Sequence, residues 1–320
     1  MFLGIEIGGT KLQLGVGHGD GRLLGLWRGT VDAAAGGDGI RRRIEAAIPE
    51  LLATANADRS ALRGVGVGFG GPVDDATRSV IKSHQIAGWD GFPLADWVSD
   101  LVGAPAVLGN DADVAGLGEA LFGAGRGLSP IFYITIGSGI GGGLIIDGRI
   151  HRGCGRGAAE IGHTQVHLAD DEGGHTLTLE QLASGWGIAN RARCVLHLGW
   201  SALYDPSTLR ALPSDELTAV RIAAEARGGD RLANLLLSQA VWGLTQAIRQ
   251  VIVLLCPRRI VVGGGVSLIG DELFFAPLRE SVERTAFAPF AGLTDIVPAA
   301  LGEEVVVHGA LALARQKISG

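Results

Sequence analysis

Apolar positions alternate with glycine and polar positions along the first 30 residues. Apolar runs cover Phe2–Ile7 and Leu23–Trp27, and between them every second residue of 12–16 is apolar. A period of two is typical of β-strands, and the separating segments Gly8–Lys11 and Gly19–Arg22 carry residues that favour turns. We therefore expect three consecutive strands joined by two tight turns.

The same order of elements recurs near the middle of the chain. Ile131–Ile136 is a second apolar run, a glycine-rich loop follows, and Leu144–Ile146 is apolar again. The next residues, Asp147–Arg149, repeat the Asp-Gly-Arg sequence of Asp20–Arg22. This repetition predicts an internal duplication with one copy in each of two domains.

Strands and helices alternate through the rest of the chain. Further strands are expected at residues 64–69, 106–108 and 259–262, and apolar residues at helical spacing predict helices at 39–57, 112–122, 179–197, 231–255, 270–285 and 303–317. Pro49 is expected to kink or shorten the first of these helices. The alternation predicts the α/β class.

Composition narrows the class of protein. The 320 residues leave room for two domains, and 47% hydrophobic with 19% charged residues is a globular balance. A net charge of −6 argues against binding to nucleic acid or to an acidic membrane face. The N-terminus lacks the features of a signal peptide, and no apolar run is long enough to span a membrane. Three cysteines far apart in sequence predict neither a disulfide framework nor a cysteine-rich zinc site, so we expect a cytoplasmic protein.

Polar and glycine groups gather where the predicted strands end, at five segments: Gly8–Lys11, Gly70–Asp74, Asn110–Asp111, Gly137–Gly139 and Gly263–Gly265. Ligands of α/β sheets bind at the carboxyl ends of strands. Glycine loops leave backbone N–H groups bare, so they can wrap an anion such as phosphate. The alternative for each loop is a hairpin turn that only needs glycine. Several such loops together favour a phosphate-binding cleft.

Asp111 stands where an apolar strand becomes a helix. One interpretation is a helix N-cap, a frequent use of aspartate. The other is a general base that accepts a proton from a hydroxyl as a phosphoryl group arrives, since phosphoryl transfer needs positioning, charge neutralisation and a base.

Other polar residues also allow a structural or a ligand-binding interpretation. Glu160 and His163 are three residues apart and suit either a metal pair or hydrogen bonding to a polyol; further metal ligands are lacking nearby, which favours the polyol. Glu6 lies between Ile5 and Ile7, is buried by pattern, and needs a partner, for which Mg²⁺ through water is suitable. Lys11 suits either phosphate binding or a strand surface.

These segments together resemble the motifs of the ROK family of sugar kinases, in the actin-like ATPase superfamily. The resemblance covers nearly the whole chain and rests on Ile5–Lys11, Gly70–Asp74, Gly88–Trp89, Asn110–Ala112, Thr135–Gly143, Glu160–His163 and Gly263–Val266, in the family's order. It implies an α/β, two-domain actin-like ATPase (ribonuclease H-like) fold with a duplicated βββαβα core. The implied domains are residues 1–115 plus 302–320, a small N-terminal domain, and 116–301, a large C-terminal domain.

The resemblance also implies the roles of individual residues. Asp111 would be the general base, and Mg²⁺ would be held by Glu6, through water. The hexose would be bound by Gly71, Gln85, Asn110, Glu160, His163 and Glu180. ATP would be bound by Gly8, Gly9, Thr10, Lys11, Thr135, Gly137, Ser138, Gly139, Gly263, Gly264 and Gly265. The family further implies a homodimer.

Four departures from the family pattern bear on these expectations. Glu6 replaces the usual aspartate of the first loop, and Asp113 replaces a common asparagine. The family's zinc cysteines are absent between His163 and Glu180, so we predict no structural zinc. Gln85 stands where an asparagine often binds sugar, and Ala159 replaces a glycine before Glu160; both leave the hexose open.

The leading hypothesis is ATP-dependent phosphorylation of a hexose, at the C6 hydroxyl, as in glucokinases. Polyphosphate as donor is an alternative, because polyphosphate glucokinases also lack the zinc cysteines. A sugar-binding regulator without catalysis is another, although Asn110–Asp111 and Glu160–His163 are intact. A transcriptional repressor is disfavoured, because the first loop begins at Gly8, leaving no room for a preceding helix-turn-helix, and the charge is acidic.

Overall fold

The computed structural model describes residues 1–74, 76–83, 86–169, 173–197 and 207–318. The chain forms two compact units: the first comprises Met1–Tyr133, Gly143–Ala159 and Ala299–Gly320, and the second Ile134–Gly142 and Glu160–Pro298. The division falls inside the two strands β8 (Ile131–Ile136) and β9 (Ile140–Ile146). The boundary expected between residues 115 and 116 stays a prediction.

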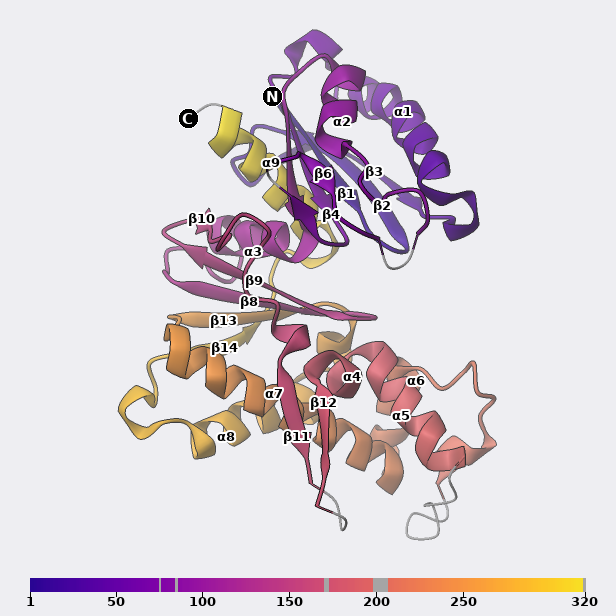
Figure 1. The fold of residues 1–320 in the computed structure, drawn as a ribbon, viewed down its shortest axis with the longest axis vertical. Coiled ribbons are helices and arrows are strands. Elements are labelled where there is room, and N and C mark those ends of the chain that lie inside the picture. The colour runs from indigo at the N-terminus through magenta and orange to yellow at the C-terminus, as the bar shows by residue number, and fades with distance from the viewer. Residues whose placement is uncertain (75, 84–85, 170–172, 198–206, 319–320) are drawn as a thin grey trace. The chain divides into compact units, whose positions relative to one another are not determined.

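The first unit is built on a five-stranded sheet in the order β3-β2-β1-β4-β7 (Figure 1). Its strands are β1 (Phe2–Ile7), β2 (Lys11–Gly17), β3 (Leu23–Thr30), β4 (Val65–Phe69) and β7 (Ala106–Asn110). Its helices are α1 (Gly36–Thr54), α2 (Leu94–Val102), α3 (Asp111–Phe122) and α9 (Val305–Ile318). The first three strands are antiparallel, whereas β4 and β7 run parallel to β1.

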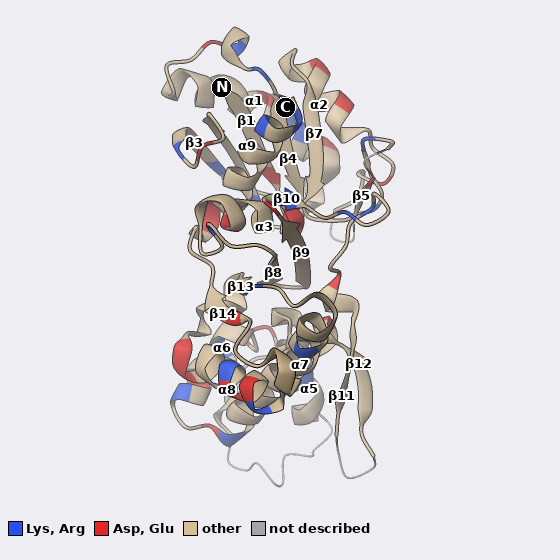
Figure 2. Ribbon diagram, turned by 90° about the vertical axis from the view of Figure 1, so that its left-hand side faces the viewer, with Lys and Arg blue, Asp and Glu red and all other residues tan. Residues whose placement is uncertain are grey.

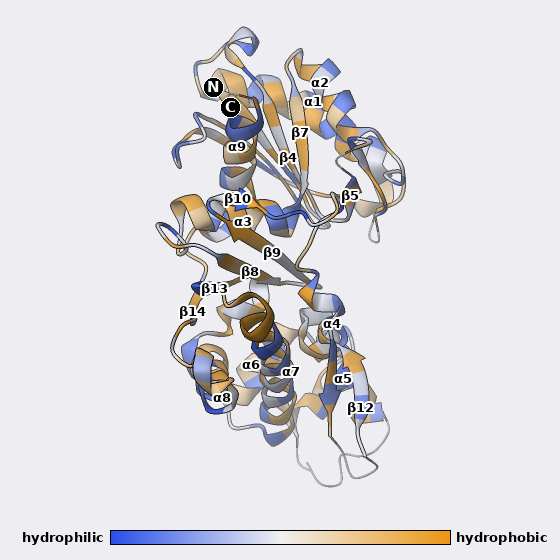
Figure 3. Cartoon of the chain, turned by 60° about the vertical axis from the view of Figure 1, so that its left-hand side comes forward, coloured by the Kyte–Doolittle hydropathy of each residue, from blue (hydrophilic) through white to orange (hydrophobic). Residues whose placement is uncertain are grey.

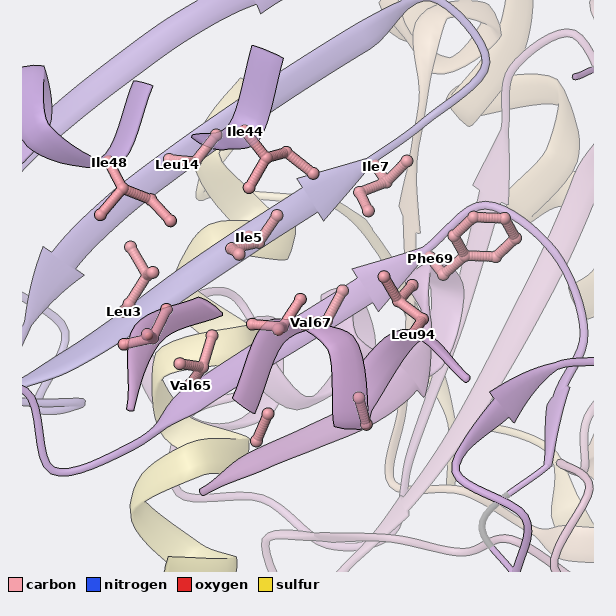
Figure 4. Close-up of a cluster of buried hydrophobic side chains, with 14 of the residues drawn as sticks. Leu3, Ile5, Ile7, Leu14, Ile44, Ile48, Val65, Val67, Phe69 and Leu94 are labelled. Carbon is pink, nitrogen blue, oxygen red and sulfur yellow. The ribbon is translucent and has the colours of Figure 1, made fainter. Parts of the chain in front are cut away.

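Large side chains occupy one face of this sheet because they alternate along its strands. Leu3, Ile5 and Ile7 of β1 and Val67 of β4 point to the same side, where they pack with Ile44 of α1 (Figure 4). All five are at most 1% exposed, so this face forms the core of the unit. Full burial of one such side chain stabilises the fold by roughly 1.5–3 kcal/mol.

Glycines occupy the opposite face, where α9 lies close to the backbone of the sheet. A Cβ added to Gly66 would come within 1.9 Å of the Ala310 carbonyl oxygen, and one on Gly68 within 2.4 Å of Val306 Cγ1. The Val-Gly-Val-Gly sequence of β4 thus supplies large residues to the core and bare backbone to α9. A side chain at Gly66 would displace that helix.

The second sheet has the order β10-β9-β8-β13-β14, which repeats the 3-2-1-4-5 order of the first. Its other strands are β10 (Arg149–Ile150), β13 (Arg259–Gly263) and β14 (Asp295–Pro298). Strands β8 and β9 are largely apolar (Figure 3), and most of their residues are buried. The predicted duplication and the α/β class are confirmed.

The second unit contains five helices of the described chain: α4 (Leu179–Ala183), α5 (Gly185–His197), α6 (Ala219–Arg227), α7 (Arg231–Leu255) and α8 (Ala276–Thr285). Short hairpins are β5–β6 (Val73–Asp74 and Ser79–Val80), in the first unit, and β11–β12 (Gln165–Leu168 and His175–Thr178), in the second.

Two expected helices differ from the structure. The predicted helix 179–197 is broken at Ser184, whose backbone is extended (φ −71°, ψ 164°) and whose hydroxyl accepts a hydrogen bond from Gly187 N–H. The serine thus begins a new helix, as side-chain caps do. By contrast, α1 continues through Pro49 to Thr54. Pro49 is exposed, so water can satisfy the carbonyl that loses its partner.

Within the described ranges, no helix combines the length and the apolar character that crossing a membrane requires.

Candidate active site

Gly70 and Gly71 join the carboxyl ends of three strands in the first unit. Gly70 N–H donates to the Ile7 carbonyl at the end of β1, at 2.8 Å. A Cβ on Gly70 would lie 3.4 Å from Asp111 Oδ2, and Asn110 Nδ2 donates to the Gly71 carbonyl at 3.1 Å. The ends of β1, β4 and β7 therefore bring Gly71, Asn110 and Asp111 together.

The cap of helix α3 is Asn110 rather than Asp111. Asn110 Oδ1 accepts from Ala112 N–H at 3.0 Å and from Asp113 N–H at 3.4 Å. This leaves Asp111 as the first helical residue, with its Oδ1 accepting from Ala112 N–H at 2.8 Å. The helix N-terminus favours the ionised carboxylate there. The capping interpretation of Asp111 is wrong, because Asn110 is the N-cap of α3.

Glu6 is buried on the glycine-bearing face of β1, 8% exposed, directly opposite Gln13 of β2. Glu6 Oε2 and Gln13 Oε1 are both buried and meet no hydrogen-bond donor among the described residues. Desolvation, opposed by Lys11 and reinforced by the charges of Asp111, Glu303 and Glu304, raises the pKa of Glu6 to about 7. A proton on Glu6 would supply the donor that this pair lacks.

A hydrated Mg²⁺ fits the same position. Water bound to the ion carries donors that Glu6 Oε2 and Gln13 Oε1 can both accept, and its charge would offset the burial of the carboxylate. Asp111 contributes a second nearby negative charge, since it raises the pKa of Glu6. Hard oxygen donors with a shared negative charge are the environment that Mg²⁺ prefers.

The first glycine loop is a tight turn between β1 and β2. Gly8 N–H donates to the Lys11 carbonyl at 2.9 Å, and Gly9 and Thr10 lie at the outside of the turn. Lys11 Nζ lies 3.6 Å from Glu303 Oε1, with both side chains largely solvated, so this ion pair is weak and the lysine can turn to another anion.

Sequence reasoning missed the acidic pair Glu303–Glu304 beside this turn. Gln13 Nε2 donates to the Glu303 carbonyl at 3.2 Å, and both carboxylates raise the pKa of Glu6. Two acidic residues at the start of a predicted helix were the available signal, but their distance of almost 300 residues from Glu6 hid the contact.

In the second unit, the loop 137–139 is held by its carbonyl groups. Gly137 O accepts from Gly185 N–H at 2.8 Å, and Ser138 O accepts from Trp186 N–H at 3.3 Å. Among the described residues, the N–H groups of Ser138 and Gly139 meet no acceptor. Fixed carbonyls and unengaged N–H groups are the arrangement of an anion-binding loop.

Ile140 contacts both Glu180 and the short turn that carries Glu160 and His163. Its N–H donates to Glu180 Oε2 at 2.8 Å, while its carbonyl oxygen would be 2.2 Å from a Cβ on Gly162. Gly162 therefore lets the short turn that carries Glu160 and His163 lie against the start of β9. Both Glu160 and His163 reach the surface, so they are accessible to a polyol.

Ala159 precedes this turn and has a left-handed backbone, with φ at +67°. An alanine in this region is strained by roughly 1–2 kcal/mol, which explains why the family pattern has glycine here.

The loop Gly263–Gly265 begins at the last residue of β13 and contacts the end of β8. A Cβ on Gly264 would lie 2.5 Å from the Ile136 carbonyl oxygen, and its φ is +86°. Gly265 and Gly137 differ, because a Cβ on either would meet no described atom within 4 Å and neither has a positive φ. Packing inside the protein explains glycine at 264 but not at 137 or 265.

Two predictions, the role of Gln85 and the absence of a structural zinc, are not tested by the described contacts. Gln85, a predicted sugar ligand, lies outside the described residues. In the described ranges no group of three or more His, Cys, Asp or Glu could hold a metal ion. The absence of a structural zinc remains a prediction, as do the roles of the residues above.

The chain is similar to known sugar kinases along nearly its whole length. The glucokinase of Thermotoga maritima is 31% identical over 322 residues, covering 100% of this chain and 98% of that protein. The crystal structure of a ROK hexokinase from Thermus thermophilus superposes with a TM-score of 0.82 at 26% identity, covering 99% of both chains. A ROK family glucokinase from Streptomyces griseus, solved in complex with glucose and AMPPNP, has a TM-score of 0.75 at 32% identity, covering 98% of this chain and 99% of that one.

These similarities support sugar kinase activity. The model of the ROK family matches residues 2–317, which is nearly the whole chain. With the repeated sheet order and the loops described above, this match shows that the chain belongs to the ROK family and has the actin-like ATPase fold.

Proposed function

We propose that this protein transfers the γ-phosphoryl group of ATP to the C6 hydroxyl of a hexose, as a glucokinase does. The observation that carries the proposal is the position of Asp111, a carboxylate at a helix N-terminus beside the Gly70–Gly71 turn and near buried Glu6. A relative of 32% identity binds glucose and AMPPNP, which supports both the sugar and the nucleotide.

Asp111 acts as the general base in this mechanism. Its Oδ1 accepts a hydrogen bond from Ala112 N–H, which fixes the orientation of the carboxylate. The carboxylate accepts the proton of the sugar hydroxyl while that oxygen attacks phosphorus, a contribution that is typically 10²–10⁴-fold in rate. The Asn110 side chain is held by the hydrogen bonds it makes to Ala112 N–H and to the Gly71 carbonyl, and it orients the sugar beside the base.

The remaining residues bind and orient. Glu160, His163 and Glu180 accept and donate hydrogen bonds to vicinal hydroxyls. The N–H groups of Gly9 and Thr10 in the first loop, and those of Ser138 and Gly139 in the second, bind phosphate oxygens. Gly263–Gly265 lies against the nucleoside. Glu6 would hold Mg²⁺ through water, and the ion, when bound, neutralises charge on the phosphates.

A coupled assay of ADP release tests the reaction, with glucose, fructose, mannose, allose and N-acetyl sugars as acceptors. ATP and inorganic polyphosphate are compared as donors, with sugar phosphate measured directly for polyphosphate. We expect turnover with ATP and glucose, and 6-phosphorylated product by NMR. Binding of hexose without product from either donor would instead indicate a non-catalytic sugar-binding regulator.

Asp111→Asn tests the base separately. The amide keeps the shape and can still accept from Ala112 N–H, but it cannot take a proton, so kcat should fall by roughly 10²–10⁴-fold with little change in hexose affinity. Asp100→Asn, an exposed position on α2, is the matched control and should leave both unchanged. Near-normal turnover of Asp111→Asn would remove Asp111 from the mechanism.

A further inference from the structure

A hollow of about 300 Å³ in the first unit is lined by four basic side chains: Arg78, Arg149, Arg152 and Lys317. None of its described lining residues is acidic, and none of them is assigned above to sugar, nucleotide or magnesium. The hollow therefore shares no described lining residue with the candidate active site.

Two of these cations are available to a ligand. Arg149 and Lys317 reach the surface, and neither has an ion pair among the residues that the structure describes. Arg78 donates through Nε to Asp96 Oδ1 at 2.6 Å, which leaves further guanidinium N–H groups for other acceptors. Figure 2 shows the basic residues of α9 gathered near the C-terminus of the chain.

The floor of the hollow is apolar and firmly held. Val107 and Leu108 of β7 and Leu313 of α9 line it, and Leu108 and Leu313 are buried. Gln316 Nε2 donates to the Gly148 carbonyl at 2.8 Å, which ties the end of α9 to the turn between β9 and β10. The hollow thus combines cations with an apolar surface, on elements that are fixed to one another.

We propose that this hollow binds a phosphate monoester of a small organic molecule. A monoester carries about −1.5 to −2 charges near pH 7, and guanidinium and ammonium groups are its usual partners in proteins. The volume is at the lower end of the range for ligand pockets, so it admits more than a phosphate group alone. The apolar floor would contact the organic part of the monoester.

The location links the hollow to the candidate active site through one strand. Val107 and Leu108, in the floor, lie on β7 shortly before Asn110 and Asp111. A ligand seated there would contact the strand that leads to the proposed base. The inference itself concerns binding and does not depend on the proposed reaction.

Isothermal titration calorimetry of the full chain tests the proposal. Phenyl phosphate is the main probe, with inorganic phosphate and phenol as its separate halves, and glucose 6-phosphate distinguishes a sugar body from an aromatic one. We expect saturable binding of at least one monoester, about tenfold or more tighter than either half. The double variant Arg149→Ala/Lys317→Ala should weaken it about tenfold or more, because two charged donors are lost.

The double variant Arg22→Ala/Arg42→Ala is the matched control, since both arginines reach the surface of the same unit and the change in net charge is equal. It should bind the monoester within about twofold of the parent. Circular dichroism and hexose binding should be unchanged in both double variants. Equal weakening in the two pairs, undiminished binding by Arg149→Ala/Lys317→Ala, inorganic phosphate binding as tightly as the monoesters, or no saturable binding of either monoester would each overturn the proposal.

Discussion

At the scale of the residue, Glu6 shows how burial sets the chemistry of a carboxylate. Its pKa is raised from 4.5 to about 7, first by desolvation. Because the folded protein holds this proton to higher pH than the unfolded chain does, the contribution of Glu6 to stability falls as pH rises from about 4.5 to about 7. The total loss is about 3 kcal/mol, because a difference of one between the folded and unfolded pKa corresponds to about 1.4 kcal/mol.

Glu6→Gln should therefore flatten the dependence of stability on pH. The amide never ionises and can donate to Gln13 Oε1, so the variant should be more stable than the parent at pH 8 without Mg²⁺, by about 2–3 kcal/mol. Urea unfolding between pH 5 and 8 measures this. Glu303→Gln, at an exposed carboxylate that affects Glu6 only through space, should keep most of the slope. An unchanged slope in Glu6→Gln would refute the assignment.

The same change bears on magnesium. If Glu6 holds Mg²⁺ through water, the parent at pH 8 should be stabilised by the ion in the presence of nucleotide, and Glu6→Gln should lose that stabilisation. Thermal unfolding with Mg²⁺ and with EDTA separates the two cases without any measurement of turnover.

At the scale of the element, the glycine loop after β13 contains two glycines with different physical roles. Gly264→Ala would place Cβ 2.5 Å from the Ile136 carbonyl at a positive φ, so it should unfold or strongly destabilise the protein. Gly265→Ala meets open space, so the free energy of unfolding should change by less than about 0.5 kcal/mol. If backbone at 265 approaches the nucleotide, the KM for ATP should rise several-fold with little change in the KM for hexose. An unaltered KM for ATP would exclude a close approach there.

Secondary structure was predictable where the pattern is local. The alternation in β1 and β4 identified their strands. The predicted start of a helix at residue 179 is also correct, because Thr178 forms a capping box with Gln181 there. The break at Ser184 and the passage of α1 through Pro49 depend on one hydroxyl and on one exposed carbonyl, which periodicity does not show.

The candidate site was predictable only in part, because its chemistry depends on contacts between distant segments. Motif order pointed to Asp111, Glu160 and the glycine loops as candidates, and their roles stay predictions. It did not show that Asn110 is the cap of α3, or that Glu303 lies beside Lys11. The basic hollow is built from Arg78, Arg149 and Lys317, which no sequence window contains together.

At the scale of the whole molecule, Glu119 is placed where the chain returns to the first unit. This buried carboxylate, 0% exposed, accepts from Ala300 N–H at 2.9 Å and Leu301 N–H at 2.8 Å through Oε1, and from Ala124 N–H at 2.7 Å through Oε2. Ala299 begins the final segment of that unit, which includes α9. The Glu119 side chain thus binds the returning segment, which lies about 180 residues later in the sequence, to the end of α3.

Glu119→Gln should weaken this connection, because the amide keeps one acceptor oxygen and turns an NH₂ group toward a backbone donor. Loss of charge-assisted bonds and one unsatisfied buried N–H should destabilise the protein by about 3 kcal/mol. Glu45→Gln, exposed on α1, should change stability by less than about 0.5 kcal/mol. Hydrogen exchange gives a local readout: the amides of Ala124, Ala300 and Leu301 should exchange faster in Glu119→Gln, whereas those of β1 follow only global unfolding. Equal protection at these three amides in both variants would mean that the carboxylate does not hold the returning segment in place.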